Sequence, residues 1–479
     1  MPGEHYISLR PLPTQRAAES HRVIEGKNMR NKKADVLVIG SGMGGMSAAA
    51  LLAKDGFKVF VAEKSSRIGG RCSTLEYKGY KCTSGVLAVE TNGIVQELFQ
   101  QTGAEFKVLP AGALQYMING KPFQVPQSGG MKALLEVTGA GQDSIEKIMS
   151  AMSRAINWKE PSPGITLFDW IQQYTDHSGI IEVFQALVKT ALMVKADQVS
   201  ARYFFKYIQT VKGANEFGYS SEGSAALPQA LGQIVLRNGG EIWTDSKVTR
   251  IKTDESVVQG ALLKHQDREF QIEAQVVVSD TGPEKTVELA GKQLFDRDYL
   301  QELEAKMDPT AILCLQIGLE EPLFEQNHLL LTNSKRVYAL YQPTKICPDL
   351  APEGKHLLIA NAIPDSAGAL SSEVGRQNEI DLCFADIKRI FPEFEKRATT
   401  LLTGLFRDYW PGMHSWPGKD MPLKTPIINL YNVGDGVKQS GYSGLPAVVK
   451  SGMLVSQEIR QRMAVFGGTG HQGIVKSSG

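Results

Sequence analysis

The chain has 479 residues, 42% of them apolar and 22% charged, so it can bury a large core and has the mass of two or three domains. Its formal net charge is only +1, and this balance argues against a nucleic-acid-binding protein. No stretch approaches the unbroken apolar run of about 18 residues that a membrane span needs. The five cysteines form no Cys-x-x-Cys pair, which favours a reducing cytoplasm over a disulfide scaffold or a zinc site.

The two ends of the chain are polar and show no regular apolar period. Residues 1–33 carry scattered charges without the apolar region of a secretory signal, so we expect a disordered extension there. The glycine-rich residues 466–479 are expected to form a flexible tail. The first element that we predict is Ala34–Ile39, a short β-branched run typical of a buried parallel strand.

A glycine-rich turn, "GSGMGG", follows this strand at once. Gly40 permits a tight turn, Gly42 lets the backbone approach a phosphate, and Gly45 lets the next helix pack closely on the strand. That helix is predicted over Met46–Lys54, and its amide dipoles can hold a diphosphate. The loop residues that we assign to a dinucleotide are Gly40, Ser41, Gly42, Gly44 and Gly45.

A second strand, Lys58–Ala62, ends at Glu63. This acid lies about 20 residues beyond the turn, where the ribose hydroxyls of a dinucleotide are bound. A strand before the glycines, a helix after them and an acid at this distance favour a dinucleotide site over a turn that binds nothing.

The stretch "VIGSGMGGMSAAALLAKDGFKVFVAEKSSRIGGR" resembles the N-terminal FAD signature of the amine oxidase and phytoene desaturase flavoproteins. In that superfamily Glu-Lys followed by Gly-Gly-Arg continues the diphosphate site. The resemblance implies that Lys64, Gly70 and Arg71 lie at the cofactor, with the Arg71 guanidinium donating near the flavin or the diphosphate. The alternative is that Arg71 is a surface arginine after a turn.

A second anchor is predicted near the other end of the chain, where the strand Asn429–Val433 leads to Gly-Asp and then to a helix over Leu445–Met463. This segment resembles the C-terminal FAD motif of the same superfamily, in which Gly-Asp contacts the ribityl and phosphate region. The implied contacts are Asp435, Gly444 and Leu445. A helix N-terminus at the flavin's pyrimidine edge would stabilise the reduced ring by about 0.3–2 kcal/mol. The alternative is an ordinary strand–loop–helix.

The middle of the chain contains a third block, with a helix that ends at Asn238–Gly240 and two strands after it. It resembles the desaturase segment in which a strand, here near Val248, meets the adenine through its backbone. The chain has Glu222-Gly223 where the family often has Gly-Gly, so the resemblance does not extend to a cofactor contact by that loop.

Together these blocks predict an α/β fold: a Rossmann-like FAD domain of the glutathione-reductase / p-hydroxybenzoate-hydroxylase type, interleaved with an α+β substrate domain. The FAD domain is expected to be discontinuous, and the two insertions are expected to form the substrate domain. The expected bounds are 34–110, 222–300 and 420–465 for the FAD domain, and 111–221 and 301–419 for the substrate domain.

The catalytic residues are not identified by any motif. Trp410, His414 and Trp416 could line a pocket over the flavin, with His414 handling a proton, but buried aromatics and a solvated histidine are the favoured interpretation. Tyr442 could face the ring or merely pack. No cysteine lies near Asp435, so FAD is expected to bind non-covalently, and no metal site is expected.

The resemblance implies an FAD-dependent oxidoreductase that transfers a hydride between the flavin and an apolar small molecule, as desaturases and saturases do. Three alternatives stay open: an amine oxidase that uses oxygen, a redox-neutral isomerase or hydratase, and a non-catalytic binding protein like the GDP-dissociation inhibitors. The last is disfavoured because those proteins lack the complete glycine fingerprint and the terminal Gly-Asp. We expect a separate electron acceptor or donor, no nucleic acid partner, and a cytoplasmic enzyme that can contact a membrane peripherally. The substrate, the direction of hydride transfer and the oligomeric state are left open.

Overall fold

The computed structural model describes residues 30–467, except 113–114, 127, 158–160, 163, 212–215 and 409. The extension predicted over residues 1–29 and the tail over 468–479 lie outside the described residues. The expected boundary at residue 33 is wrong, because residues 30–33 begin strand β1 (Arg30–Ile39) and pair with residues 270–273. At the other end, helix α13 (Gly444–Gly467) includes the first two residues of the expected tail.

A mainly parallel seven-stranded sheet forms the first layer of the described residues, in the order β10-β2-β1-β13-β12-β11, with β19 beside β13. Strands β10, β2, β1, β13 and β19 run parallel, whereas β11 and β12 complete an antiparallel meander with β13. The remaining bounds are β2 (Val59–Ala62), β10 (Glu241–Trp243), β11 (Ser246–Asp254), β12 (Val257–His265), β13 (Arg268–Ser279) and β19 (Leu430–Asn432).

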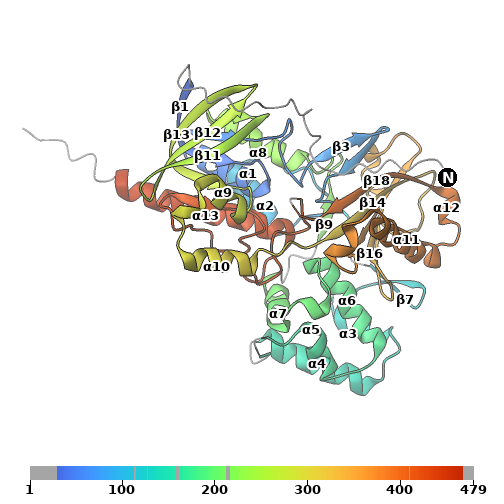
Figure 1. Ribbon diagram of the computed structural model, residues 1–479. Helices are drawn as coiled ribbons and strands as arrows, with labels where there is room; N and C mark the ends of the chain where they lie inside the picture. Colours follow the sequence, from blue (N-terminus) through green and yellow to red (C-terminus); the bar gives the residue numbers. More distant parts are fainter. Residues whose placement is uncertain are drawn as a thin grey trace, which may run out of the picture.

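The alternating side chains of β1 explain how this sheet is covered on both faces. Val36 and Val38 pack under four helices, whereas Leu37 and Ile39 face the opposite side, where β11, β12 and two further helices lie. Figure 1 shows these layers at the upper left of the molecule, with α13 running across them. The first group of helices is α1 (Met43–Lys54), α2 (Ile94–Thr102), α8 (Ala226–Arg237) and α13; the second is α9 (Pro283–Ala290) and α10 (Arg297–Lys306).

A second seven-stranded sheet, in the order β18-β14-β17-β16-β15-β7-β8, forms the other half of the described chain (Figure 1). Its strand β14 (Ile312–Leu319) is buried along its whole length, as expected from the apolar run "ILCLQIGL", and α11 (Glu373–Ile390) packs against this sheet. The other strands are β7 (Gln115–Ile118), β8 (Lys121–Gln124), β15 (His328–Leu331), β16 (Val337–Tyr341), β17 (His356–Ala362) and β18 (Ala398–Phe406).

A cluster of short helices covers the lower end of this second sheet in Figure 1. Their Met, Phe and Leu side chains form one apolar core around Trp170 and Phe184. The helices are α3 (Gly130–Glu136), α4 (Gln142–Ile156), α5 (Leu167–Gln172), α6 (Ser178–Leu192) and α7 (Ala201–Thr210). Small sheets link the two halves, formed by β3 (Thr74–Tyr77) with β4 (Tyr80–Thr83), and by β5 (Val89–Glu90), β9 (Phe217–Tyr219) and β6 (Leu109–Pro110); α12 (Phe394–Arg397) precedes β18.

The strand register decides where the loops of the first sheet meet. Ile39 is paired with Ser279, and Ser279 with Asn432, so β1, β13 and β19 end side by side. Ligands of open α/β sheets bind outside the carboxyl ends of such strands. A ligand-binding site is therefore expected at the loops that follow these three strands.

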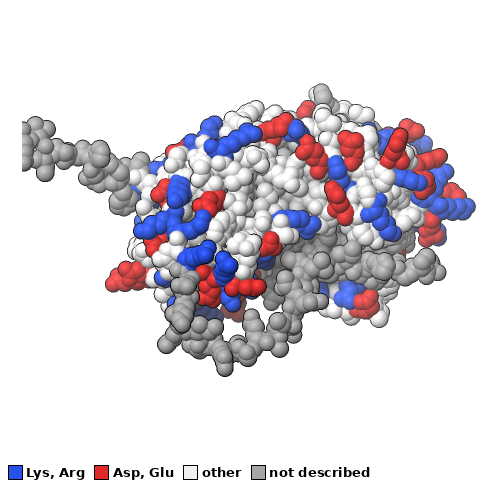
Figure 2. Space-filling model, turned by 90° about the horizontal axis from the view of Figure 1, so that it is seen from above, with Lys and Arg blue, Asp and Glu red and all other residues white. Residues whose placement is uncertain are grey.

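The surface agrees with the balanced composition. Figure 2 shows basic and acidic side chains intermixed on one face, around a broad area without charged residues. Large exposed apolar side chains of the described residues lie on separate elements: Leu109, Val137, Leu236, Val374 and Ile428. Within the described ranges, no helix combines the length and the apolar character needed to cross a bilayer.

Candidate functional site

The glycine loop connects β1 to α1 and has the close packing that its sequence predicts. Gly40 has φ +91°, and a Cβ at Gly45 would stand 2.5 Å from the Gly40 carbonyl oxygen and 3.1 Å from Val38 Cγ1. The predicted reason for the third glycine is thus confirmed: only a residue without a side chain lets α1 approach the strand. The helix begins at Met43, three residues earlier than predicted, so Gly44 and Gly45 lie in its first turn.

The second glycine pair lies along the first loop. The Gly69 N–H donates to the Ser41 carbonyl at 2.9 Å, and Gly42 and Gly69 form an isolated parallel bridge. Gly70 has φ +57°, and a Cβ there would stand 3.7 Å from Gly42 Cα. The two glycine motifs therefore build one backbone surface, whose own residues present no side chain to a diphosphate.

Glu63 is buried at the end of β2 and holds this loop from below. One carboxylate oxygen accepts the Ser41 N–H at 2.9 Å and the Ser41 hydroxyl at 2.7 Å, and the other accepts the Ser65 N–H and hydroxyl at 2.8 Å each. The Ser65 hydroxyl has one proton and also lies 2.6 Å from the Arg67 carbonyl oxygen, so it can donate to either acceptor. A ribose hydroxyl could therefore take its position on Glu63 without disturbing the Ser41 hydroxyl or the two N–H groups.

Two further predicted positions are Lys64 and Val248, and Glu222 is the position at which the chain departs from the family. Lys64 is exposed. Val248 is buried in β11, two residues after Ser246, whose N–H donates to the Glu63 carbonyl at 2.7 Å. Glu222 is exposed and pairs with Lys107 at 3.2 Å.

Arg71 and Asp435 join the two ends of the chain. The Arg71 guanidinium donates from both terminal nitrogens to the Asp435 carboxylate, at 2.7 and 2.9 Å, across 364 residues of sequence. Nη1 also donates to the carbonyls of Pro411 and Gly412 at 3.0 Å. The alternative that Arg71 is an ordinary surface arginine is wrong, because its side chain is only 24% exposed and forms this planar fork.

His414 is the third member of this cluster. Its Nδ1 lies 2.6 Å from Asp435 Oδ1, and its side chain is 21% exposed. The favoured interpretation of a solvated histidine is therefore wrong. Burial alone would raise the pKa of Asp435, but Arg71 and His414 outweigh burial and hold this pKa well below its usual range. An ionised Asp435 accepts from Nδ1–H and so fixes the orientation of the imidazole ring.

A second network, which sequence reasoning missed, supports the turn after Asp435. The Lys438 side chain is fully buried. Its ammonium group donates to the Asp435 carbonyl at 2.6 Å and to the Ser415 hydroxyl at 2.7 Å. It also pairs with Asp420 at 2.8 Å. The one available signal was a single lysine in an otherwise uncharged glycine-rich turn.

Asp280 is the other residue that sequence reasoning missed. It follows β13 directly, and its carboxyl group lies against the glycine loop: a Cβ at Gly42 would stand 2.5 Å from its Oδ2, and Cβ atoms at Gly44 and Gly434 would stand 2.9 Å from its Oδ1. The Gly45 N–H donates to this carboxyl group. The available signal was a carboxylate at the carboxyl end of an apolar strand, "VVVSD".

The turn after Asp435 leads to the start of α13, which the sequence predicts at the cofactor. Gly444 is the first residue of α13 with φ +57°, and Leu445 is buried. The buried Ser443 hydroxyl has no hydrogen-bond partner. Tyr442 is half-buried, and its carbonyl accepts a hydrogen bond from the Tyr203 hydroxyl at 2.7 Å.

The two tryptophans near His414 are partly buried and lie in different surroundings. Trp410 packs near strands β14 and β18, and Trp416 packs against the helical cluster. Their indole nitrogens are buried and have no partner. Buried aromatic packing, the favoured interpretation of this pair, describes both.

The residues present fit a flavin dinucleotide. The six glycines of the two motifs form one backbone surface, and α13 begins nine residues after Asp435. The glycine loop and the residue before α13 each carry a buried polar atom without a partner, Asp280 Oδ2 and Ser443 Oγ. Unpaired buried polar atoms are costly, so a ligand that pairs with both would be stabilised.

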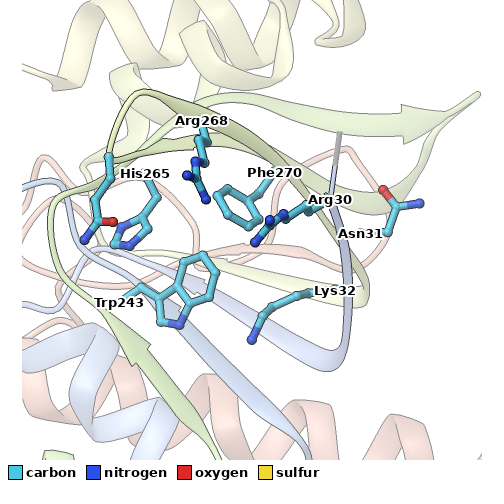
Figure 3. A pocket seen from close by; sticks show the side chains of 8 residues that line it. Arg30, Asn31, Lys32, Trp243, His265, Arg268 and Phe270 are labelled. Carbon is cyan, nitrogen blue, oxygen red and sulfur yellow. The ribbon is translucent and has the colours of Figure 1, made fainter. Parts of the chain in front are cut away.

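A cavity of about 380 Å³ lies elsewhere, near the start of β1 and the β12–β13 turn (Figure 3). Trp243 and Phe270 line it together with Arg30, Lys32 and Arg268. Lys32 pairs with Glu241, and both arginines are exposed, so water can solvate their guanidinium groups. This cavity lies at the amino end of β1, away from the glycine loop, and is not part of the site.

Comparison with known proteins identifies the family and the fold. The family model described as flavin containing amine oxidoreductase matches residues 43–460. An uncharacterized protein of Methanocaldococcus jannaschii is 26% identical over 84% of this chain and 94% of its own length. A 4,4'-diaponeurosporene oxygenase of Staphylococcus haemolyticus is 23% identical, covering 90% of this chain and 97% of its own. The crystal structure of an oxidoreductase from Methanosarcina mazei superposes with a TM-score of 0.77 at 26% identity, covering 89% of this chain and all of that one.

Proposed function

The chain belongs to the flavin containing amine oxidoreductase family, and on this premise we propose that it binds FAD non-covalently and transfers a hydride between the flavin and an apolar small molecule. Membership of the family makes it a flavin-dependent oxidoreductase. The apolar substrate is suggested by the relative from S. haemolyticus, whose name describes a carotenoid oxygenase.

The observation that carries the proposal is the contact between Arg71 and Asp435. It brings the Gly-Gly-Arg motif and the Gly-Asp motif to one point, where β1, β13 and β19 end. The glycine loop would hold the diphosphate, and the N-terminus of α13 would face the ring. When bound, a flavin accepts or donates a hydride at its ring.

The protein's own residues then have distinct tasks. Asp435 orients Arg71 and the imidazole ring of His414, so that Nε2 of His414 can take up or release the proton that accompanies hydride transfer. The α13 dipole favours the negative charge of a reduced ring. Glu63 keeps Ser41 and the glycine loop in position.

We also infer a separate electron acceptor or donor. Among the described residues, β1 is the only strand that leads through Gly-x-Gly-x-x-Gly into a helix, so the fold offers no second nucleotide loop there. For the expected peripheral membrane contact, the scattered exposed apolar residues provide no clear surface. Sedimentation with lipid vesicles is its direct test.

Absorbance spectroscopy of the purified protein, followed by acid precipitation, tests the cofactor. We expect a flavin spectrum and release of FAD into the supernatant, because the C-terminal motif around Asp435 contains no cysteine to link a flavin. A colourless protein that takes up no added FAD would refute the proposal, and flavin in the precipitate would refute non-covalent binding.

Anaerobic reduction trials then identify the chemistry. A polyene that is oxidised by the bound flavin, or reduced by the pre-reduced flavin, supports hydride exchange with an apolar substrate. Peroxide release with amines in air would instead assign an amine oxidase, and turnover only after reduction, without net electron loss, would assign an isomerase or hydratase.

A further inference from the structure

Asp280 lies where an ionised carboxylate would disfavour the binding of an anionic ligand. Its carboxyl group lies against the glycine loop, with its oxygens 2.5–2.9 Å from the positions that Cβ atoms would take at Gly42, Gly44 and Gly434. The proposed function places the diphosphate at Gly42 and Gly44, and Gly434 belongs to the Gly-Asp motif that the resemblance places at the ribityl chain. An ionised Asp280 would therefore repel the cofactor at short range.

The hydrogen bonds of Asp280 show which form of the side chain suits the site. The backbone N–H of Gly45 donates to the carboxyl group, whereas Oδ2 is buried and accepts from nothing. A neutral carboxylic acid has one O–H to donate, and an anionic ligand above the glycines would be its acceptor. A proton on Asp280 Oδ2, donated to a bound anionic ligand, would explain why this buried oxygen has no partner within the protein.

The charges around Asp280 favour the same form. Glu63 and Asp435 are the acidic groups that face it, and Arg71 is the basic one, already bound by Asp435. Burial, with the carboxylates of Asp435 and Glu63, raises the pKa of Asp280 to about 8, although the Gly45 N–H and Arg71 oppose the rise. A diphosphate would add further negative charge and raise this pKa again.

We propose that Asp280 is a cofactor-binding residue that acts as a neutral carboxylic acid, donating a hydrogen bond from Oδ2 to the anionic part of FAD, so that FAD binding takes up a proton. The inference rests on the proposed FAD site. At pH values where Asp280 of the unbound protein is ionised, one proton from solvent binds to its carboxylate when FAD binds. No covalent bond of FAD changes.

Linkage gives the sign and size of the effect. The unbound protein loses the Asp280 proton as the pH rises through about 8, whereas the bound form keeps it, so affinity falls as the pH rises. Between pH 7 and pH 9 we expect the Kd for FAD to rise about tenfold. Proton uptake should grow from nearly none at pH 7 to about one per FAD at pH 9.

Fluorescence titration of the FAD-depleted full chain with FAD, from pH 7 to pH 9, tests the proposal. The variant Asp280→Asn is neutral at every pH, so its Kd should stay constant over this range. Asp254→Asn is the matched control, because Asp254 is an exposed carboxylate on β11 of the same sheet, and this variant should follow the wild type. An equal pH dependence in the wild type and Asp280→Asn, or a flat profile in the wild type, would overturn the inference.

Calorimetry of the wild type alone keeps the test independent of how the variant folds. Titrations at pH 9 in two buffers with different heats of ionisation report the number of protons taken up, and a value near zero would overturn the inference. Failure of the proposed function looks different: the wild type would then bind no FAD at any pH.

Discussion

The ion pair between Arg71 and Asp435 predicts a strong energetic coupling between two distant parts of the chain. Replacing Asp435 with Asn keeps the shape but removes the charge that accepts two hydrogen bonds from Arg71 and one from His414. A hydrogen bond to a charged group contributes about 1.5–3 kcal/mol, and breaking one side of a buried pair costs about 3–5 kcal/mol. Because the Arg71 side chain is 24% exposed and partly screened, we expect Asp435→Asn to lower the free energy of unfolding by about 3 kcal/mol.

A double-mutant cycle measures this coupling. Arg71→Gln should lower the free energy of unfolding by a similar amount, since it leaves the buried Asp435 carboxylate without its guanidinium partner. The double variant should lose about 2 kcal/mol less than the sum of the losses in the two single variants. Urea unfolding of the FAD-free protein, followed by tryptophan fluorescence, provides the free energies without a contribution from cofactor binding.

The control is an exposed pair of similar length. Lys388 and Glu395 lie 2.6 Å apart, with side chains 52% and 57% exposed, and their cycle should give less than about 1 kcal/mol. If the losses of unfolding free energy for the Arg71 and Asp435 variants were additive, or their coupling no larger than that of the surface pair, the contact would not hold the Gly-Gly-Arg and Gly-Asp segments together.

Three further predictions concern the same site. Gly45→Ala places a Cβ 2.5 Å from the Gly40 carbonyl oxygen, so the purified protein should contain less than about a tenth of the wild-type flavin per chain; normal flavin content would contradict the close packing of α1 on β1. Ser443→Ala should weaken FAD binding about five- to tenfold in a fluorescence titration but leave the urea midpoint of the FAD-free protein unchanged, because its hydroxyl has no internal partner; a lowered midpoint would show a structural role instead. The folded pKa of Asp435 lies below its unfolded value, so its contribution to stability is present at neutral pH and lost as the pH falls below about 4; a wild-type acid unfolding profile in Asp435→Asn would contradict this.

Local patterns in the sequence were enough to locate the backbone part of the site. The apolar strand before Gly40, the glycine spacing and Glu63 lie within about one βαβ unit, in which propensity and turn chemistry decide the structure. The same holds for the strand, Gly-Asp turn and helix near Asp435. Boundaries were less accurate: β1 begins at Arg30 because it pairs with β13, a partner that the local sequence does not reveal.

Only the tertiary structure decided which side chains meet at the site. Asp280 comes to lie under the glycine loop because β13 is inserted between β1 and β19, a strand order that depends on pairing across more than two hundred residues. The same order brings Arg71 to Asp435, and loop packing brings His414 and Lys438 to that point. The sequence by itself thus determined the fold class and the glycine surface, because those arise from short-range backbone chemistry; charge pairing and proton positions depend on long-range contacts, and no local pattern encodes them.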